Sequence, residues 1–472
     1  MSECVLVKSI RGADVLISDG YTYHLNKKVN ETFYWRCAKK SKANCGVTLT
    51  TKWCHDKHTD MKLNHDHDHL PDPEALIRRK LTSSLKDKAG NSMDSPAQII
   101  QRCIQDVPPS CAPHLPNKVA MSMTIQRTRN KNMPALPKTV HDVEIPEEFV
   151  KFMIGHYTYK NESVLVFTTK ENVQLLQKAQ YWLMDGTFQC SPKPYIQIYT
   201  VHARIGSEDG VNKILPLVYG LLSHKTQNCY KIFLEILRCQ ALSCFDIRLS
   251  PKFIILDFEI AAINAVKLVF PDCAQKLCFF HLTQTIWRHI QSAGLAKRYG
   301  TDPGFAHKMR HLAALAFLEP HEIPSAFQML KENIFPEEAK EIVEWFEKYY
   351  INGSFQRRTL KNPQFPPEMW CIYDRYVSSV PVTQNALESW HNRWNTLLNR
   401  KKWNLFKTIA EFQKEQKNTE CTIERITSSE PMPKRKRGSS NTQRIMQHYS
   451  KKNEMDIDDF LSGLAYICYI KH

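Results

Sequence analysis

The sequence predicts an α/β protein in which helices cover both faces of a sheet and a long helical region follows, with a small β-rich module in front. Three observations lead to this prediction. Between about residues 141 and 290, short and almost continuously apolar segments alternate with helical patterns, as expected for a sheet buried on both faces. Between residues 295 and 380 the strand signal disappears and helical spacing remains. Near the N-terminus, short apolar segments are separated by turn residues instead.

Changes in composition divide the 472 residues into four regions. We expect a β-rich module at residues 4–72 and a basic helical connector at residues 73–140. The α/β domain is expected at residues 141–412, with its helical insertion at residues 295–380. Residues 413–472 are expected to form a basic and partly disordered tail.

The overall charge favours a polyanionic partner. Lys and Arg number 64 against 48 Asp and Glu, which gives a net charge of +16. No apolar run of about 18 residues is present, and the N-terminal segment lacks the pattern of a secretory signal, so we expect no membrane span and no secretion. The 15 scattered cysteines then favour a reducing compartment and a few metal-bound thiolates over a disulfide scaffold. A merely basic soluble protein is the alternative.

The N-terminal module contains too few apolar residues to be stable by burial alone. Short strands are expected around Leu6 and Leu16, and the dipeptide Asp19-Gly20 indicates a turn that follows the second. Aromatic residues supply only a very small core, so the module requires a metal or a disulfide. These aromatic residues are Tyr21, Tyr23, Phe33, Tyr34 and Trp35.

Two cysteines and a downstream histidine cluster offer a metal site in this module. Cys37 and Cys45 flank a basic loop, and His65, His67 and His69 follow. Two thiolates and two imidazoles close a tetrahedral site around Zn²⁺, and the bound metal then supplies folding free energy. Three histidines leave the choice of two open. Further candidates are Cys54, His55 and His58, and the alternative is a His-rich surface loop with two free thiols.

The order of these residues resembles the FLYWCH-type zinc finger over about residues 4–72. The resemblance rests on the aromatic series that runs through Trp35 into Cys37, then on Cys45, and then on the paired histidines before Leu70. It implies that Cys37, Cys45, His67 and His69 bind zinc. It also implies contact with DNA, or less often with protein.

The connector is predicted to be helical. Helical patterns cover residues 74–88 and 96–106, and they are separated by a segment with Gly90 and followed by Pro108 and Pro109. A basic run then extends over residues 127–131. We interpret the region as a second DNA-contacting element, with a solvated linker as the alternative.

Acidic residues follow two of the expected strands of the α/β domain. Strands are expected at residues 181–184, 195–205, 215–222, 253–256 and 277–280, and helices at residues 230–242 and 260–270. Asp185 follows the first of these strands and Asp257 the fourth. A carboxylate at the end of an apolar strand is costly unless it is solvated or binds something, and carboxylates are the ligands of Mg²⁺. The alternatives are a helix-capping role for Asp257 and Glu259 as the ligand.

A third carboxylate lies on the helical stretch at residues 385–412. At helical spacing, Glu388 shares a polar face with His391, Asn392 and Asn395. The alternative is a capping box that begins at Asn385. The adjoining apolar stripe comprises Leu387, Trp390, Trp394, Leu397 and Leu398.

Cys278 and His281 form a C-x-x-H pair where a strand meets a helix. Two residues do not make a metal site, so the pair taken alone indicates a buried cysteine and a histidine at a helix start.

Taken together, these segments resemble the MULE (Mutator-like element) transposase domain over about residues 150–400, most strongly at 181–290. The resemblance implies an RNase H-like fold: a mixed sheet with helices on both faces and a helical insertion before the final acidic residue. It implies that Asp185, Asp257 and Glu388 form a catalytic triad that binds Mg²⁺ or Mn²⁺. Cys278 and His281 match the family's C-x-x-H motif, to which we assign a structural or DNA-end-contacting role. The SWIM-type zinc finger of many relatives is not expected, because the tail contains only Cys421 and Cys468.

The sequence therefore predicts a DNA transposase of the Mutator-like type. Its finger would recognise double-stranded DNA at element terminal repeats, and two-metal catalysis would cut and join phosphodiesters. Paired DNA ends imply a homo-oligomer, and the basic run at residues 433–437 predicts nuclear import. The alternative is a domesticated, non-catalytic DNA-binding transcription regulator. A zinc-containing protein-interaction adaptor is a third interpretation.

Overall fold

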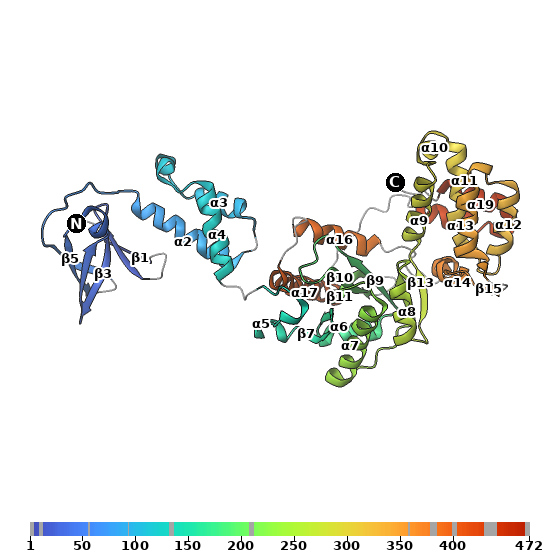
Figure 1. The fold of residues 1–472 in the computed structure, drawn as a ribbon, viewed down its shortest axis with the longest axis horizontal. Coiled ribbons are helices and arrows are strands. Elements are labelled where there is room, and N and C mark those ends of the chain that lie inside the picture. The colour runs from blue at the N-terminus through green and yellow to red at the C-terminus, as the bar shows by residue number, and fades with distance from the viewer. Residues whose placement is uncertain are drawn as a thin grey trace. The chain divides into compact units, whose positions relative to one another are not determined.

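The computed structural model describes residues 4–8, 13–54, 57–92, 94–131, 136–206, 212–356, 359–377, 385–398, 404–428 and 441–467. The chain divides into two compact units, Met1–Ala135 and Leu136–His472 (Figure 1). Among the described helices, none is long and apolar enough to cross a membrane.

The first unit begins with a six-stranded antiparallel sheet whose strands follow one another in chain order. The predicted turn at Asp19 and Gly20 is confirmed, because both residues have positive φ, 50° and 77°. A Cβ at Gly20 would lie 2.9 Å from the Cβ of Pro71, so the turn also packs closely against the end of the module. The strands are β1 Val5–Lys8, β2 Asp14–Ser18, β3 Tyr21–Val29, β4 Thr32–Cys37, β5 Thr48–Cys54 and β6 Lys57–Leu63, with the short helix α1 Lys40–Ala43 between β4 and β5.

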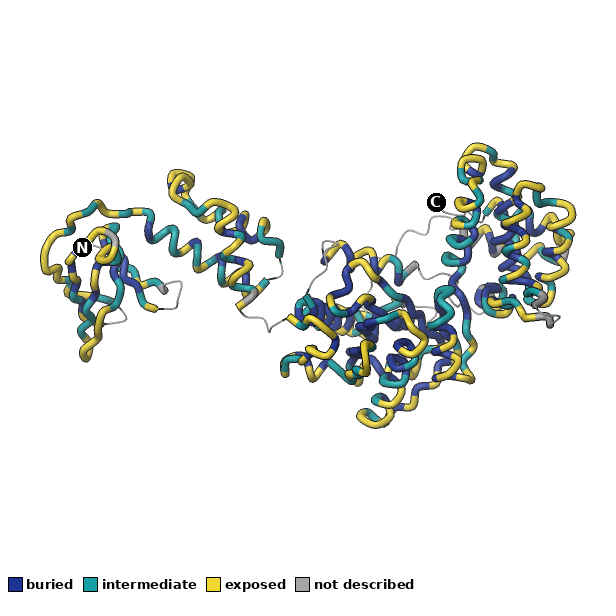
Figure 2. The backbone as a smooth tube through the Cα atoms, in the orientation of Figure 1, coloured by how far each residue is buried: buried dark blue, intermediate teal, exposed yellow. Residues whose placement is uncertain are grey.

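Three helices follow the N-terminal sheet and form their own small core. Both predicted helices are present, as α2 Ala75–Asn91 and α3 Pro96–Ile104. After the 3-10 turn η1 Pro109–His114, the basic run lies at the end of a further helix, α4 Lys118–Lys131. Leu85, Ile99 and Ile125 are buried between the helices, so the region is a folded bundle and not a solvated linker (Figure 2).

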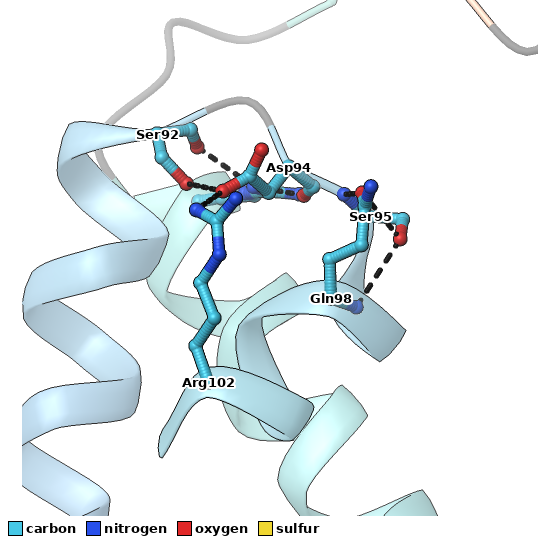
Figure 3. A network of polar contacts seen from close by, with 6 residues as sticks. Ser92, Asp94, Ser95, Gln98 and Arg102 are labelled. Atoms are coloured by element: carbon cyan, nitrogen blue, oxygen red, sulfur yellow. Dashed lines mark hydrogen bonds and ion pairs between the residues drawn. The ribbon is translucent and has the colours of Figure 1, made fainter. Parts of the chain in front are cut away.

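Polar contacts fix the turn between α2 and α3. Ser95 and Gln98 form a reciprocal capping box at the start of α3, and Asp94 accepts hydrogen bonds from Ser92 and Arg102 (Figure 3). Arg129 donates from α4 to the backbone carbonyls of Ala89, Ser92 and Asp94. One of the cations in the basic run is therefore used to close the bundle.

The second unit contains a seven-stranded mixed sheet in the order β13-β12-β9-β10-β11-β8-β7. Neighbouring strands from β9 to β7 are antiparallel, whereas β12 is parallel to both β9 and β13. The mixed sheet is as predicted. Its strands are β7 Met153–Tyr159, β8 Glu162–Phe167, β9 Tyr181–Thr187, β10 Gln197–Gly206, β11 Asn212–Leu222, β12 Phe253–Leu256 and β13 Ala274–Leu277.

Two strands differ from their predicted bounds for identifiable reasons. β9 continues through Asp185, because it pairs with β10 as far as Thr187. β13 begins earlier than the apolar run, since the ammonium of Lys276 donates to the carbonyl of Glu368 and can therefore be buried. The apolar residues after Leu277 instead begin a helix, α9 Phe279–Ser292.

Helices cover both faces of this sheet, as predicted. Alternate residues of β8 separate the two faces, with Val164 and Val166 in one core and Leu165 and Phe167 in the other. The first face packs against α6 Lys170–Lys178, α7 Gln227–Phe245 and α8 Ile260–Val269. The other packs against α5 Glu147–Val150, α16 Asn385–Leu397 and α17 Leu405–Thr427 (Figure 1).

The region after β13, where a helical insertion is expected, is mainly helical. After α9 it comprises α10 Ala296–Thr301, α11 Pro303–Ala314, η3 Leu315–Phe317, α12 Ile323–Asn333, η4 Glu337–Ala339, α13 Lys340–Phe346, the π-helical turn η5 Glu347–Ile351, the paired strands β14 Ser354–Gln356 and β15 Thr359–Lys361, and the helices α14 Pro367–Trp370 and α15 Tyr373–Val377.

The region expected as a partly disordered tail is largely folded where the structure describes it. Residues up to Thr427 continue α17, and α18 Asn441–Tyr449, η6 Lys452–Glu454 and α19 Ile457–Ile467 follow. α19 packs against α11 because Phe460 and Leu464 lie on one helical face and are fully buried. The basic run at residues 433–437 and Cys468 lie outside the described residues.

Candidate functional site

The zinc module brings Cys37, Cys45, His67 and His69 together. One possible ligand atom from each residue lies within 4.8 Å of the others. The Sγ of Cys37 is 3.2 Å from Nε2 of His69, and the Sγ of Cys45 is 3.4 Å from Nδ1 of His67. These separations suit a tetrahedral ion with bonds of about 2.0–2.3 Å. Strand β4 carries the first cysteine, a loop after α1 carries the second, and the segment after β6 carries both histidines.

The remaining ring nitrogens orient both histidines. Nε2 of His67 lies 2.8 Å from the hydroxyl of Tyr23, and Nδ1 of His69 lies 3.0 Å from the carbonyl oxygen of Leu70. The ring of Tyr21 stacks on His67 with centroids 3.7 Å apart. This leaves Nδ1 of His67 and Nε2 of His69 to face the cysteines, as expected where outer contacts fix the tautomer of a metal ligand.

The other sulfur and imidazole candidates of the module lie elsewhere. His65 lies beside Gly46, with its Nε2 3.6 Å from where a Cβ would be. Nδ1 of His58 is 2.9 Å from the Thr51 hydroxyl, and its ring packs against Trp35. Cys54 is exposed, and His55 lies outside the described residues.

Burial also prepares the quartet for a cation. It lowers the pKa of the His67 imidazole and so favours the neutral form that binds metals. It raises the pKa of the Cys37 thiol, because a buried thiolate needs a compensating positive charge. The protein and Zn²⁺ therefore complement each other at this site.

In the second unit, the sheet register sets Asp185 beside Asp257. β9 and β12 are parallel, and Leu183 lies opposite Ile255. Asp185 lies two residues after Leu183, and Asp257 lies two residues after Ile255. Because the strands are parallel, both carboxylates therefore lie at the same end of this strand pair. Asp185 is 7% exposed, and its Oδ1 accepts a 2.7 Å hydrogen bond from the N–H of Gly186.

The two carboxylates interact electrostatically. Burial raises the pKa of Asp257 to about 7, and the negative charges of Asp185 and Glu259 contribute to the increase. The backbone N–H of Glu259 donates to Oδ1 of Asp257 at 3.2 Å. The alternative role of Asp257 as the helix cap is not confirmed, because Glu259 is the N-cap of α8 and no side chain caps this helix. Glu259 itself pairs with Lys225 at 3.6 Å.

Helix α16 places Glu388 at the same site. Leu387 packs in a cluster with Leu183 and Ile255, the residues two positions before the two aspartates. One turn further along, Nδ1 of His391 lies 3.4 Å from Oδ2 of Asp185. The burial of Trp390 and Trp394 confirms the predicted apolar stripe, although Leu397 is exposed. The side chain of Asn385 lies outside the described residues.

The C-x-x-H pair belongs to this site as well. Cys278 is fully buried in the cluster with Leu387, and His281 lies on the first turn of α9. Burial lowers the pKa of His281, but a hydrogen bond with Cys278 and the negative charges of Asp185 and Glu388 outweigh it and raise the pKa. His281 therefore lies close enough to two of the predicted acidic residues to sense their charge.

A cleft of about 460 Å³ opens beside the acidic residues. Asp257, Glu259 and His281 line its sheet end, and residues of α9 and of the insertion line most of the rest. Lys225 also lines it, with its ammonium 3.7 Å from the centroid of the exposed Phe188 ring. The mixture of carboxylates, cations and aromatic rings is suited to a phosphorylated ligand held near a metal.

Two residues of the site carry no predicted role in the sequence. His391 stands on the predicted polar face, but its contact with Asp185 depends on how α16 packs on β9. His202 on β10 is fully buried, its ring lies 5.4 Å from that of Trp390, and burial holds its pKa well below the ordinary range. The position of His202 inside a mostly apolar strand is the one feature of the sequence that could have singled out this residue.

These features define a protein that combines a Cys/His zinc module with an α/β domain bearing clustered acidic residues. Comparison with protein families identifies both parts. Residues 6–69 match the FLYWCH zinc finger domain, and residues 181–285 match the MULE transposase domain. The chain thus has a segment similar to the FLYWCH zinc finger domain followed by one similar to the MULE transposase domain, and this combination supports a transposase-like DNA-binding protein. A comparison with curated proteins found no match.

Proposed function

We propose that the protein is a Mutator-like DNA transposase that cuts and joins DNA phosphodiesters at an Asp185-Asp257-Glu388 site. The order of β9 to β13 in the sheet supports an RNase H-like fold. Strands β9, β10 and β11 pair with one another in antiparallel orientation. The next two strands, β12 and β13, extend the sheet beyond β9 and run parallel to it. The acidic residues come from the first strand, the end of the fourth strand and a late helix.

The observation that carries the proposal is the convergence of these three residues from distant parts of the chain. Strand register places Asp185 beside Asp257, and the packing of Leu387 on Leu183 brings α16 to the same point. Asp185 and Glu388 also both lie close enough to His281 for their negative charges to raise its pKa.

The donor set fits Mg²⁺ or Mn²⁺. All three candidate ligands are carboxylates, which these hard cations prefer. Burial, followed by the negative charges of Asp185 and Glu259, raises the pKa of Asp257, and a bound divalent cation would favour its charged form. When bound, such ions activate the attacking water or 3′-hydroxyl and stabilise charge on the scissile phosphate.

The neighbouring side chains would hold the carboxylates in place. His391 contacts Oδ2 of Asp185 and the Gly186 N–H contacts Oδ1, so the carboxylate orientation is fixed from both sides. The backbone N–H of Glu259 does the same for Asp257. The buried Cys278 would support this arrangement through its hydrogen bond with His281, and His281, which lines the cleft, would approach the DNA end from α9.

The remaining parts would bring DNA to the site. The finger and the basic helices of the first unit would bind double-stranded terminal repeats, with a salt-dependent affinity. The basic run at residues 433–437 would direct nuclear import. Two DNA ends must be paired before joining, so we expect a homo-oligomer on DNA.

The test is Mn²⁺-dependent cleavage of DNA that carries the genomic flanks of the gene. Wild type should cut, whereas Asp185→Ala, Asp257→Ala and Glu388→Ala should each lose at least about 100-fold in rate while retaining DNA binding. Ser389→Ala, at an exposed position next to Glu388, is the matched control and should keep the activity. If wild type and variants bind these flanks equally and none cuts them, the protein is a DNA-binding regulator and the proposal is wrong.

A further inference from the structure

The cleft beside Asp257 continues away from the acidic residues into the helical insertion. Its far wall is made by Trp345 of α13, Tyr349 of η5 and residues of α9. At about 460 Å³ it lies in the range of pockets that hold a small molecule, about 300–1,000 Å³, and so suits one nucleotide.

The aromatic residues of this wall are available to a ligand. Trp345 and Tyr349 both line the cleft, and both are only partly buried. The His289 ring supports Trp345 from α9, with ring centroids 3.6 Å apart and planes 20° apart. Burial lowers the pKa of His289, so the stack consists of two neutral rings.

The cleft is lined by acidic side chains at its sheet end and by a basic side chain of α9 farther along. Asp257 and Glu259 lie at the sheet end, where Lys225 pairs with Glu259. Arg288 of α9 lines the cleft, is exposed, and forms no ion pair within the part of the chain that the structure describes. An unpaired guanidinium beside aromatic rings is the combination that recognises a phosphate and a base together.

We infer that this cleft binds one unpaired nucleotide of the DNA strand next to the scissile phosphate. The base stacks on Trp345 and Tyr349, and Arg288 contacts its phosphate. A paired base cannot enter a pocket of this size, so the site selects DNA ends that are unpaired beside the cleavage position. This inference rests on the proposed function for the identity of the neighbouring site.

The experiment measures binding of the full chain to DNA in Ca²⁺, so that it does not depend on cleavage. The probes are a blunt duplex, the same duplex with a short single-stranded overhang, and that overhang with abasic nucleotides. Wild type should bind the base-bearing overhang at least about fivefold more tightly than the abasic one. Trp345→Ala should remove this preference without changing the affinity for the blunt duplex. Arg288→Ala should weaken the binding of both overhang probes and reduce the salt dependence of that binding.

Tyr466→Ala is the matched control. Tyr466 is also an exposed ring lying against a histidine, His307, with centroids 4.0 Å apart, but it does not line the cleft. Its removal should leave all three affinities unchanged. Trp345→Phe keeps a ring and should retain most of the preference.

Either of two results overturns the inference. One is a wild type that binds base-bearing and abasic overhangs equally, a comparison that needs no variant to fold. The other is a folded Trp345→Ala protein that keeps the preference. Loss of cleavage in every protein would contradict the proposed function alone, because the binding preference is measured separately.

Discussion

At the scale of residues, the site depends on how a few ionisable groups are surrounded. Asp257 is a carboxyl whose pKa rises to about 7 because it is buried next to Asp185 and Glu259. The unfolded chain releases this proton near its ordinary pKa of 3.8, whereas the folded protein keeps it up to about 7. The free energy of unfolding of the metal-free protein therefore falls as pH rises between these values.

We accordingly predict that Asp257→Asn stabilises the metal-free protein at pH 8 by on the order of 1–3 kcal/mol, and that the difference shrinks towards pH 4. The measurement is urea unfolding of both proteins across this pH range in a chelator. Adding Mn²⁺ should stabilise the wild type more than the variant. A wild type whose stability does not change across the range would show that the carboxyl is not perturbed.

At the scale of elements, a metal takes the place of a core in the finger. The buried apolar residues of its sheet are few, with Leu16, Trp35 and Leu49 at the centre. A structural Zn²⁺ contributes about 10–16 kcal/mol of apparent binding free energy at neutral pH, which exceeds what such a core provides.

His67→Ala and His69→Ala should therefore each abolish zinc binding and unfold the finger, whereas His65→Ala should leave both intact. Zinc content by mass spectrometry and near-UV dichroism of the purified variants measure the two effects. Zinc loss from the His65 variant alone would mean that the ligand set is different.

The helix α19 provides a second prediction at this scale. Leu464 is fully buried against the insertion, while Ile457 on the same helix is 36% exposed. Leu464→Ala should lower the free energy of unfolding by about 2–5 kcal/mol. Ile457→Ala is the control and should change it by no more than about 0.5 kcal/mol. Thermal and urea unfolding of the two variants compare these costs. Equal costs would show that α19 does not pack as described.

At the scale of the whole molecule, the two units have separate cores. Separate cores allow the units to unfold independently, and only the first contains the Cys/His quartet. Zinc chelation should therefore remove an early calorimetric transition and leave the unfolding temperature of residues 136–472 unchanged. The isolated fragment 136–472 should unfold at the same temperature. A single transition that moves as a whole with chelation would contradict this.

The pattern of residues along the chain was enough to predict much of this organisation. Continuous apolar strands such as Phe253–Leu256 predict a sheet covered on both faces, and helical spacing around Trp390 predicts which side of α16 is buried. Two cysteines and the histidine cluster predict the metal module. Each of these signals is local, so it can be read from neighbours in sequence.

Contacts between distant segments were decided by the tertiary structure alone. The sequence left three histidines open, and the packing of Tyr21 and Tyr23 distinguishes His67 from His65. Residues 413–472 read as a tail, yet α19 completes the insertion through contacts with α11.

Likewise, no local signal places Asp185 beside His391, or Trp345 in the cleft that Asp257 lines. Strand register and helix packing create these neighbours, because they join residues that the chain keeps far apart. The sequence by itself therefore determined the kinds of elements and the chemistry they carry. The fold decided which of those residues act together.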